Sequence, residues 1–140
     1  MLVVERQGLP VGVLVESAQR SEVKLAEATL ATIKVPRRIG RPKTRPKEVV
    51  ADKGYDSNAL RWKLRARGIK PCIPRRKNAL PRPGRRPNLQ GYKERWKVER
   101  TFAWLFNFRR LVVRWERSHH IFLAFLLIAC IIILLGAISG

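Results

Sequence analysis

An uncharged apolar run at the end of the sequence restricts the possible folds more than any other feature. It reads IFLAFLLIACIIILLGAIS over residues 121–139. A run of this length predicts a helix, placed here over 121–138, whose apolar surface has to be covered by something other than water. Three coverings are open: a sheet of the same domain, a second subunit, or a lipid bilayer. The basic segment FRRLVVRWERSHH just before the run would suit the cytoplasmic flank of a membrane span.

The charge balance points to a polyanionic partner. The chain has 30 Lys+Arg against 10 Asp+Glu, a net charge of +20, while its 46% apolar content is enough for a core. Nucleic acid is the usual partner of such an excess, and an anionic membrane surface is a less common one. Cys72 and Cys130 are far apart and indicate neither a disulfide framework nor a zinc site. Without a signal-peptide pattern, we expect a cytoplasmic, nucleoid-associated protein, with a membrane location through 121–138 as the alternative.

Local patterns predict one α/β domain over residues 1–140. The stretch LVVERQGLPVGVLVES predicts a β-hairpin with a turn at residues 6–8. Apolar residues at helical spacing predict a helix over 21–33, and a strand at 48–51 follows. The expected elements after that are a helix at 58–67, a strand at 69–74, and a long helix from Tyr92 past Trp115. This alternation is typical of a mixed sheet with helices, here with long C-terminal helices.

Two basic stretches broken by Pro and Gly predict exposed loops at 34–47 and 75–91. Such loops can be solvated charge, but the overall charge favours contact with the DNA backbone. The candidate DNA contacts in them are Arg37, Arg38, Arg41, Lys43, Arg45, Arg75 and Arg76.

The two aspartates of the chain, Asp52 and Asp56, lie in one short stretch, VVADKGYDSNAL. Asp52 ends a predicted strand, and Gly54 permits a sharp turn after it. Ligands and catalytic groups gather at the carboxyl ends of strands in open α/β sheets, whereas the alternative is that Asp52 caps the next helix. Either Asp56 or Ser57 can provide that cap instead.

Glu99 belongs to a helical stripe. Tyr92, Arg95, Glu99, Phe102 and Phe106 follow one another at spacings of three and four residues, which places them on one face. Because this face is partly aromatic, we expect it to look inward; the alternative is a surface ion pair between Arg95 and Glu99. Two carboxylates in a chain built to bind a polyanion suggest a Mg²⁺ site, and two such ions serve phosphodiester chemistry.

At these residues the sequence resembles a known family. The stretches VVADKGYDSNALRWKLRARGIKPCIPRR and YKERWKVERTFAWLFNFRRL resemble the catalytic part of DDE transposases of bacterial insertion sequences, of the IS-five-like group. The resemblance implies a ribonuclease-H-like fold and Mg²⁺-dependent DNA cleavage and strand transfer at a two-ion site. It maps the second catalytic Asp of the family to Asp52 and its catalytic Glu to Glu99. Tyr92 and Arg95 match residues that flank this Glu and would lie near the DNA backbone.

The sequence departs from the family pattern in two places. Phe106 stands where the family has Lys or Arg, and Arg109 and Arg110, one turn later, are the expected substitutes. The first catalytic Asp of the family lies on a strand before the hairpin with which this chain begins. The resemblance therefore implies a ribonuclease-H-like mixed sheet without its first, central strand, with helix 121–138 against that sheet. It also implies that residues 1–140 alone do not transpose DNA.

The partners expected from this interpretation are DNA, an upstream-encoded N-terminal half and, as an open possibility, further copies of the chain. Two other functions remain open. The chain can be a truncated, non-catalytic DNA-binding remnant or regulator, or a small basic membrane protein with one C-terminal span.

Overall fold

The computed structural model describes residues 1–16, 19, 21–77 and 88–139. It begins with the expected hairpin, in which strand β1 (Leu2–Val4) pairs antiparallel with β2 (Pro10–Val13). The turn between them uses Gly8 at φ +87°, a conformation that glycine adopts without strain. Helix α1 (Glu22–Ala31) packs on the hairpin so closely that a Cβ on Gly12 would lie 2.9 Å from Thr32 Oγ1.

A β-α-β unit follows. Strand β3 (Glu48–Val50) pairs parallel with β4 (Lys70–Cys72), and helix α2 (Asn58–Ala66) connects them. The Ser57 hydroxyl accepts the Leu60 N–H at 3.4 Å and caps the start of α2. Gly68, at φ +69°, ends the helix in the left-handed conformation. The predicted strands and helix of this unit are confirmed.

The main core lies between α1, α2 and the ends of the strands. Its buried side chains come from α1 and the residues after it, from α2, and from the residues flanking β4: Leu30, Ile33, Leu60, Leu64, Ile69 and Ile73. Val3 of β1 and Val49 of β3 pack against the same cluster. One apolar core therefore joins the hairpin and the β-α-β unit, although the described strands of the two units do not pair with each other.

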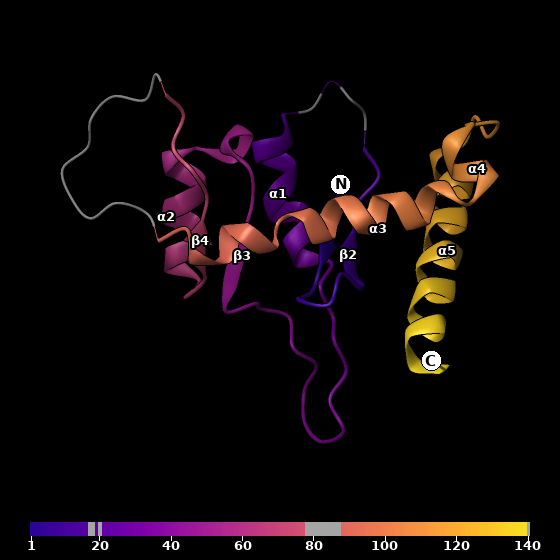
Figure 1. Ribbon diagram of the computed structural model, residues 1–140, viewed down its shortest axis with the longest axis horizontal. Coiled ribbons are helices and arrows are strands. Elements are labelled where there is room, and N and C mark those ends of the chain that lie inside the picture. The colour runs from indigo at the N-terminus through magenta and orange to yellow at the C-terminus, as the bar shows by residue number, and fades with distance from the viewer. Residues whose placement is uncertain (17–18, 20, 78–87, 140) are drawn as a thin grey trace.

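The strands form two small sheets, β1–β2 and β3–β4. Across the described residues no strand bridges the hairpin to the β-α-β unit, and the two pairs lie apart in Figure 1. The α/β class is confirmed. The division falls between the hairpin and the strand that ends before Asp52, which is where the resemblance places the absent central strand, and the ribonuclease-H-like fold stays a prediction.

The predicted long helix from Tyr92 past Trp115 is broken into three pieces. They are a 3₁₀ helix η2 (Gln90–Glu94), helix α3 (Trp96–Phe106) and the short helix α4 (Arg109–Val112). The break comes at Phe108, whose backbone is extended at φ −90° and ψ 104°. Phe108 then packs into a second apolar cluster with Leu105 and Leu111. Tertiary packing thus overrides a continuous helical pattern.

Helix α5 (His119–Ser139) confirms the predicted apolar helix. It lies at one end of the molecule and packs on α3 and α4, with Ala129 and Cys130 buried (Figure 1). Only 11% of its most apolar window is buried, and within the described residues it is the one helix long and apolar enough to cross a membrane. Most of its apolar surface is therefore exposed in the isolated chain.

Candidate functional site

Asp52 lies directly after β3, as predicted. Its backbone is extended (φ −76°, ψ 174°), and its Oδ1 accepts the N–H of Gly54, which lies in the 3₁₀ turn η1 (Lys53–Tyr55). Asp52 therefore caps this short turn, whereas Ser57 caps helix α2. The carboxylate is partly buried and its orientation is set by the backbone donor.

The face of β3 on which Asp52 lies follows from strand alternation. Val49 and Ala51 pack against the main core. The other face is covered by η2, since a Cβ on Gly91 would lie 3.1 Å from Glu48 Oε2 and 3.3 Å from Val50 Cγ2. Successive side chains of an extended chain point to opposite faces. Asp52 therefore belongs to the face of Glu48 and Val50, toward η2.

Asp56 has a structural role. Its Oδ1 accepts hydrogen bonds from Arg61 Nε (3.0 Å) and Nη2 (2.9 Å), and Oδ2 accepts the backbone N–H of Arg76 at 2.9 Å. The side chains of Arg61 and Asp56 are only 7% and 3% exposed. Arg61 also donates to the Ile73 carbonyl at 2.7 Å. This pair was not predicted from the sequence, because helical side-chain pairs are three or four residues apart, whereas Asp56 lies before α2 and five residues from Arg61.

Glu99 lies in the first turn of α3 and is exposed. Its carboxylate pairs with Arg95 Nη2 at 2.5 Å, and 58% of its side chain is accessible to solvent. The stripe of Glu99, Phe102 and Phe106 points outward, with the two rings 6.2 Å apart. The expectation of an inward-looking stripe is wrong, and the alternative, a surface ion pair, describes what the structure has.

A different face of α3 is buried, and a long-range contact selects it. Thr101 is fully buried, and its hydroxyl donates to the Gly8 carbonyl at 2.5 Å. Arg100 donates to the Gln7 carbonyl, and its guanidinium lies 4.9 Å from the Trp96 ring and 4.7 Å from the Trp104 ring. These contacts anchor α3 to the hairpin turn and leave Glu99 on the open side.

Asp52 and Glu99 therefore lie on adjoining elements. The 3₁₀ helix η2 contacts β3 and β4 and leads directly into α3, which crosses from the β-α-β unit to the hairpin (Figure 1). Throughout the described part of the chain, no group of three or more His, Cys, Asp or Glu side chains is gathered as a metal site. That the two carboxylates share one ion stays a prediction.

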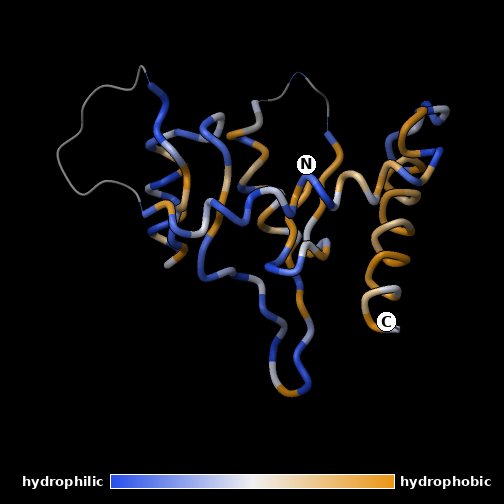
Figure 2. The backbone as a smooth tube through the Cα atoms, viewed as in Figure 1, coloured by the Kyte–Doolittle hydropathy of each residue, from blue (hydrophilic) through white to orange (hydrophobic). Residues whose placement is uncertain are grey.

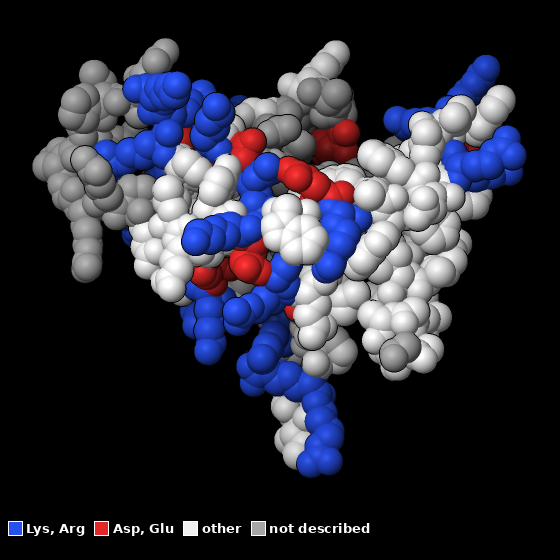
Figure 3. All heavy atoms as spheres, viewed as in Figure 1, with Lys and Arg blue, Asp and Glu red and all other residues white. Residues whose placement is uncertain are grey.

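The predicted DNA-contacting residues divide into exposed and engaged side chains. Arg37, Arg38 and Arg41 are exposed on an arm that extends away from the body, as Figure 3 shows by its blue colour. Arg45 donates to the Arg67 carbonyl at 2.9 Å, so it braces the base of that arm against the end of α2. Lys43 closes the arm by backbone pairing with Val35.

The second basic loop is described only at its ends, since residues 78–87 lie outside the described part. Arg75 is exposed. Arg76 donates to the carbonyls of Lys53 (3.2 Å) and Gly54 (2.8 Å), and so holds the turn that follows Asp52. Arg76 is thus a positioning residue for the Asp52 turn, a role that its place in a basic loop did not indicate.

The last four predicted contacts surround α3 and α4. Arg95 lies over the Tyr92 ring at 5.9 Å as well as against Glu99. Arg109 is exposed. Arg110 pairs with Glu116 at 2.6 Å and lies 5.1 Å from the Phe125 ring, so it ties α4 to α5. That either arginine replaces the basic residue expected at the position of Phe106 stays a prediction.

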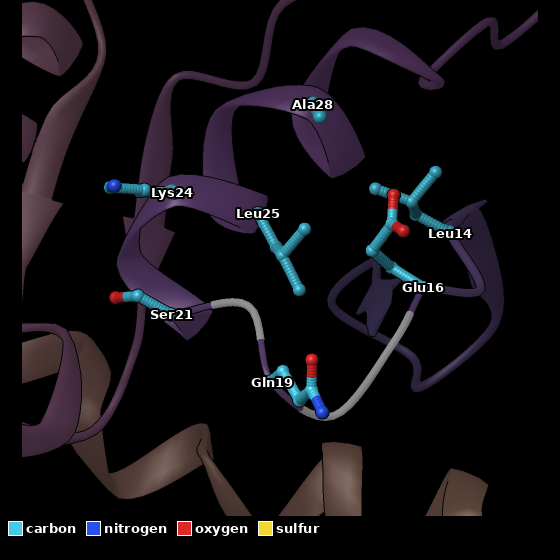
Figure 4. Close-up of a pocket in the computed structure, with 7 residues that line it drawn as sticks. All are labelled: Leu14, Glu16, Gln19, Ser21, Lys24, Leu25 and Ala28. Atoms are coloured by element: carbon cyan, nitrogen blue, oxygen red, sulfur yellow. The ribbon is translucent and has the colours of Figure 1, made fainter.

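An open hollow of about 550 Å³ lies elsewhere, between the end of the hairpin and α1 (Figure 4). Its lining includes one carboxylate, Glu16, and one ammonium group, Lys24, but none of the predicted site residues. We assign no role to it.

The chain is similar to known proteins over most of its length. The family described as "Transposase DDE domain" matches residues 1–134. A protein of Burkholderia cepacia, described as "Putative transposase for insertion sequence element IS402", is 39% identical over 134 residues. The match covers 94% of this chain and 60% of the relative, so the chain spans less than two thirds of that protein's length. No solved structure shows significant similarity to the chain.

The matched residues extend from the hairpin through the β-α-β unit, α3 and α4 into α5. They include Asp52, Glu99 and the basic loop 34–47. The chain belongs to the transposase DDE domain family.

Proposed function

We propose that the protein acts in the cytoplasm in DNA transposition, as part of an enzyme that cleaves phosphodiester bonds at the ends of a mobile element and transfers the strands to new DNA. Its ribonuclease-H-like sheet would be completed by a further strand carrying a third carboxylate. Asp52 and Glu99 would hold Mg²⁺, and the exposed arginines would hold the DNA backbone.

The position of Asp52 carries this proposal. The residue leaves β3 on the face that η2 covers, and the helix that continues from η2 carries Glu99. Carboxylate oxygens are the ligands that Mg²⁺ takes from proteins, usually one or two of them together with substrate phosphate. The Asp52–Gly54 contact orients the carboxylate before any ion arrives.

Glu99 is available for a metal although it is paired. An exposed ion pair four residues apart on a helix contributes only about 0.3–0.5 kcal/mol, so Arg95 can exchange Glu99 for a DNA phosphate at little cost. Mg²⁺ bound there would polarise a phosphoryl oxygen and stabilise the leaving oxygen. Arg95, beside Tyr92, would then position the backbone next to the two carboxylates.

The test is Mn²⁺ binding, measured by electron paramagnetic resonance in the presence of a duplex oligonucleotide. Asp52→Asn and Glu99→Gln should each weaken binding about tenfold, because each removes one charged ligand. Glu94→Gln is the matched control, since Glu94 is also exposed and also pairs with a nearby lysine, Lys97. Hydrogen bonding from Lys97 lowers the pKa of Glu94, so this carboxylate is ionised throughout the assay.

The proposal fails if Glu94→Gln weakens Mn²⁺ binding as much as Asp52→Asn does. Circular dichroism of each variant shows whether the fold is retained. A metal site that needs only Asp52, with Glu99→Gln silent, would remove Glu99 from the proposal.

A second candidate is DNA binding without catalysis. The exposure of Glu99, and the lack of a third clustered ligand among the residues that the structure covers, favour it. DNA binding measured with and without a chelator distinguishes the two candidates. A regulator without catalysis binds DNA equally well with and without divalent ions. For either, replacing the arm residues by Ala should reduce the slope of log K against log salt by about 0.9 for each phosphate that the protein no longer neutralises. The residues are Arg37, Arg38, Arg41 and Lys43.

A further inference from the structure

Residues 35–43 form a hairpin arm that stands away from the body. Val35 and Lys43 pair antiparallel, with N–H···O distances of 2.9 and 2.8 Å. The chain reverses near Gly40, at φ +91°, and a Cβ there would have no heavy atom within 4 Å. Figure 1 shows the arm as a narrow loop below the sheets. Nothing described packs against its tip.

The arm combines positive charge with an apolar tip. From Val35 to Lys43 every polar side chain is Arg or Lys. Ile39, beside the turn, is 80% exposed. Figure 2 shows a hydrophobic band at the tip of an otherwise mostly hydrophilic arm. A single exposed isoleucine needs no explanation by itself. Ile39 differs in its position, since it lies among arginines at the end of an arm that the rest of the described chain does not cover.

We propose that this arm enters the minor groove of DNA and inserts Ile39 between two base pairs, while Arg37, Arg38 and Arg41 lie along the groove and its phosphates. This inference rests on the proposed DNA-binding function. Proteins that bend DNA from the minor groove use this combination, Arg or Lys in the groove and an aliphatic wedge between bases. A narrow A·T-rich minor groove also has the negative potential that attracts arginine.

The composition favours the minor groove over the major groove. Arg and Lys also read guanine in the major groove, but the Asn, Gln, Ser, Thr and acidic side chains that contact the other bases there do not occur between Val35 and Lys43. Pro36 and Pro42 fix their backbone φ angles on the two sides of the arm. Less conformational freedom is therefore lost when the arm is ordered on DNA.

The base of the arm is fixed to the body. Arg45 donates to the Arg67 carbonyl, and the Lys70 N–H donates to the Lys47 carbonyl at 2.9 Å. The arm enters β3 at its amino end, whereas Asp52 leaves at its carboxyl end, roughly 15 Å along the strand. The arm would therefore hold and bend DNA beside the reacting bond and would not touch that bond.

The experiment uses the 140-residue chain and a duplex with one central TA step, in which 2-aminopurine replaces the adenine. Such steps unstack easily. Wild-type protein should raise the fluorescence of the probe, and Ile39→Ala should abolish the rise. Ile138→Ala is the matched control, since Ile138 is 81% exposed on α5, far from the arm in sequence. This variant should behave as wild type does.

Two further measurements complete the test: the affinity for DNA, and competition with ligands that occupy one groove. Ile39→Ala should weaken binding by about 50-fold, because three carbon atoms are no longer buried between the bases, and should leave the salt slope unchanged. Arg41→Ala should reduce that slope by about 0.9. Netropsin, which occupies the minor groove, should displace wild-type protein, and methyl green, which occupies the major groove, should not.

The minor-groove proposal is overturned if methyl green displaces the protein and netropsin does not, or if Ile39→Ala raises the probe fluorescence as wild type does. A wild-type chain that binds no duplex even at low salt would instead overturn the proposed DNA-binding function. The two failures are thus distinguishable.

Discussion

Replacing Asp56 by Ala should destabilise the protein far more than replacing Asp52 by Ala, although the two aspartates are four residues apart. Asp56 is 3% exposed in its side chain and accepts two hydrogen bonds from Arg61 and one from the Arg76 backbone. Asp52 accepts a hydrogen bond from Gly54. The structure thus assigns Asp56 to folding, whereas Asp52 is the aspartate that we propose as a metal ligand.

The magnitude follows from burial. Without Asp56, the Arg61 guanidinium still donates to the Ile73 carbonyl but has no counter-ion at 7% exposure. Removing one partner of a buried ion pair costs about 3–5 kcal/mol. Removing the Asp52 cap costs about 0.5–2 kcal/mol. With about 2–4 °C per kcal/mol for a domain near this size, Asp56→Ala should lower Tm by about 6–20 °C.

The assay is urea unfolding followed by far-UV circular dichroism, with Asp52→Ala as the control. The double variant Asp56→Ala with Arg61→Met should be more stable than Asp56→Ala alone, because it removes the unpaired buried charge. The reasoning is refuted if Asp56→Ala costs less than about 1 kcal/mol, well below the range for a buried pair. A double variant less stable than the single one would also refute it.

Three further predictions concern the hairpin turn and the thiols. Thr101→Val should cost about 1–3 kcal/mol in urea unfolding, because the Gly8 carbonyl loses its buried donor, whereas Thr101→Ser should cost less. Gly8→Ala should destabilise more than Gly40→Ala: both glycines have positive φ, but a Cβ at Gly8 would lie 2.7 Å from Arg100 Nη2, which two tryptophan rings hold in place. Burial raises the pKa of the Cys72 thiol, so alkylation by iodoacetamide at pH 8 should be slow in the folded chain and fast in urea; equal rates would contradict its burial.

Local rules accounted for the first half of the fold. The turn at Gly8, the Ser57 cap and the Gly68 helix end are signals that act within a few residues, and the elements that they bound were predicted from sequence. The place of Asp52 after β3 was predicted for the same reason. Such signals are reliable because the backbone geometry that they impose needs no distant partner.

In the second half of the fold, from α3 onward, local sequence patterns do not decide which face of a helix is buried. The spacing around Glu99 correctly placed Glu99, Phe102 and Phe106 on one helical stripe, yet the stripe points outward. α3 carries more than one apolar face, and the contact of Thr101 with Gly8, 93 residues earlier, decides which face is buried. The break at Phe108 likewise depends on packing with Leu105 and α5.

The sequence by itself determined the basic character of the chain, its local helices and strands, and the apolar helix at its end, and it supplied the two carboxylates that we propose as metal ligands. Only the tertiary structure decided that Asp56 is buried against Arg61, that Arg76 holds the Asp52 turn, that the strands form two sheets, and that Glu99 faces solvent. The reason is that charge and periodicity are properties of neighbouring residues. Burial and pairing depend on which distant segments meet, and a helical or strand pattern offers several compatible partners until packing selects one.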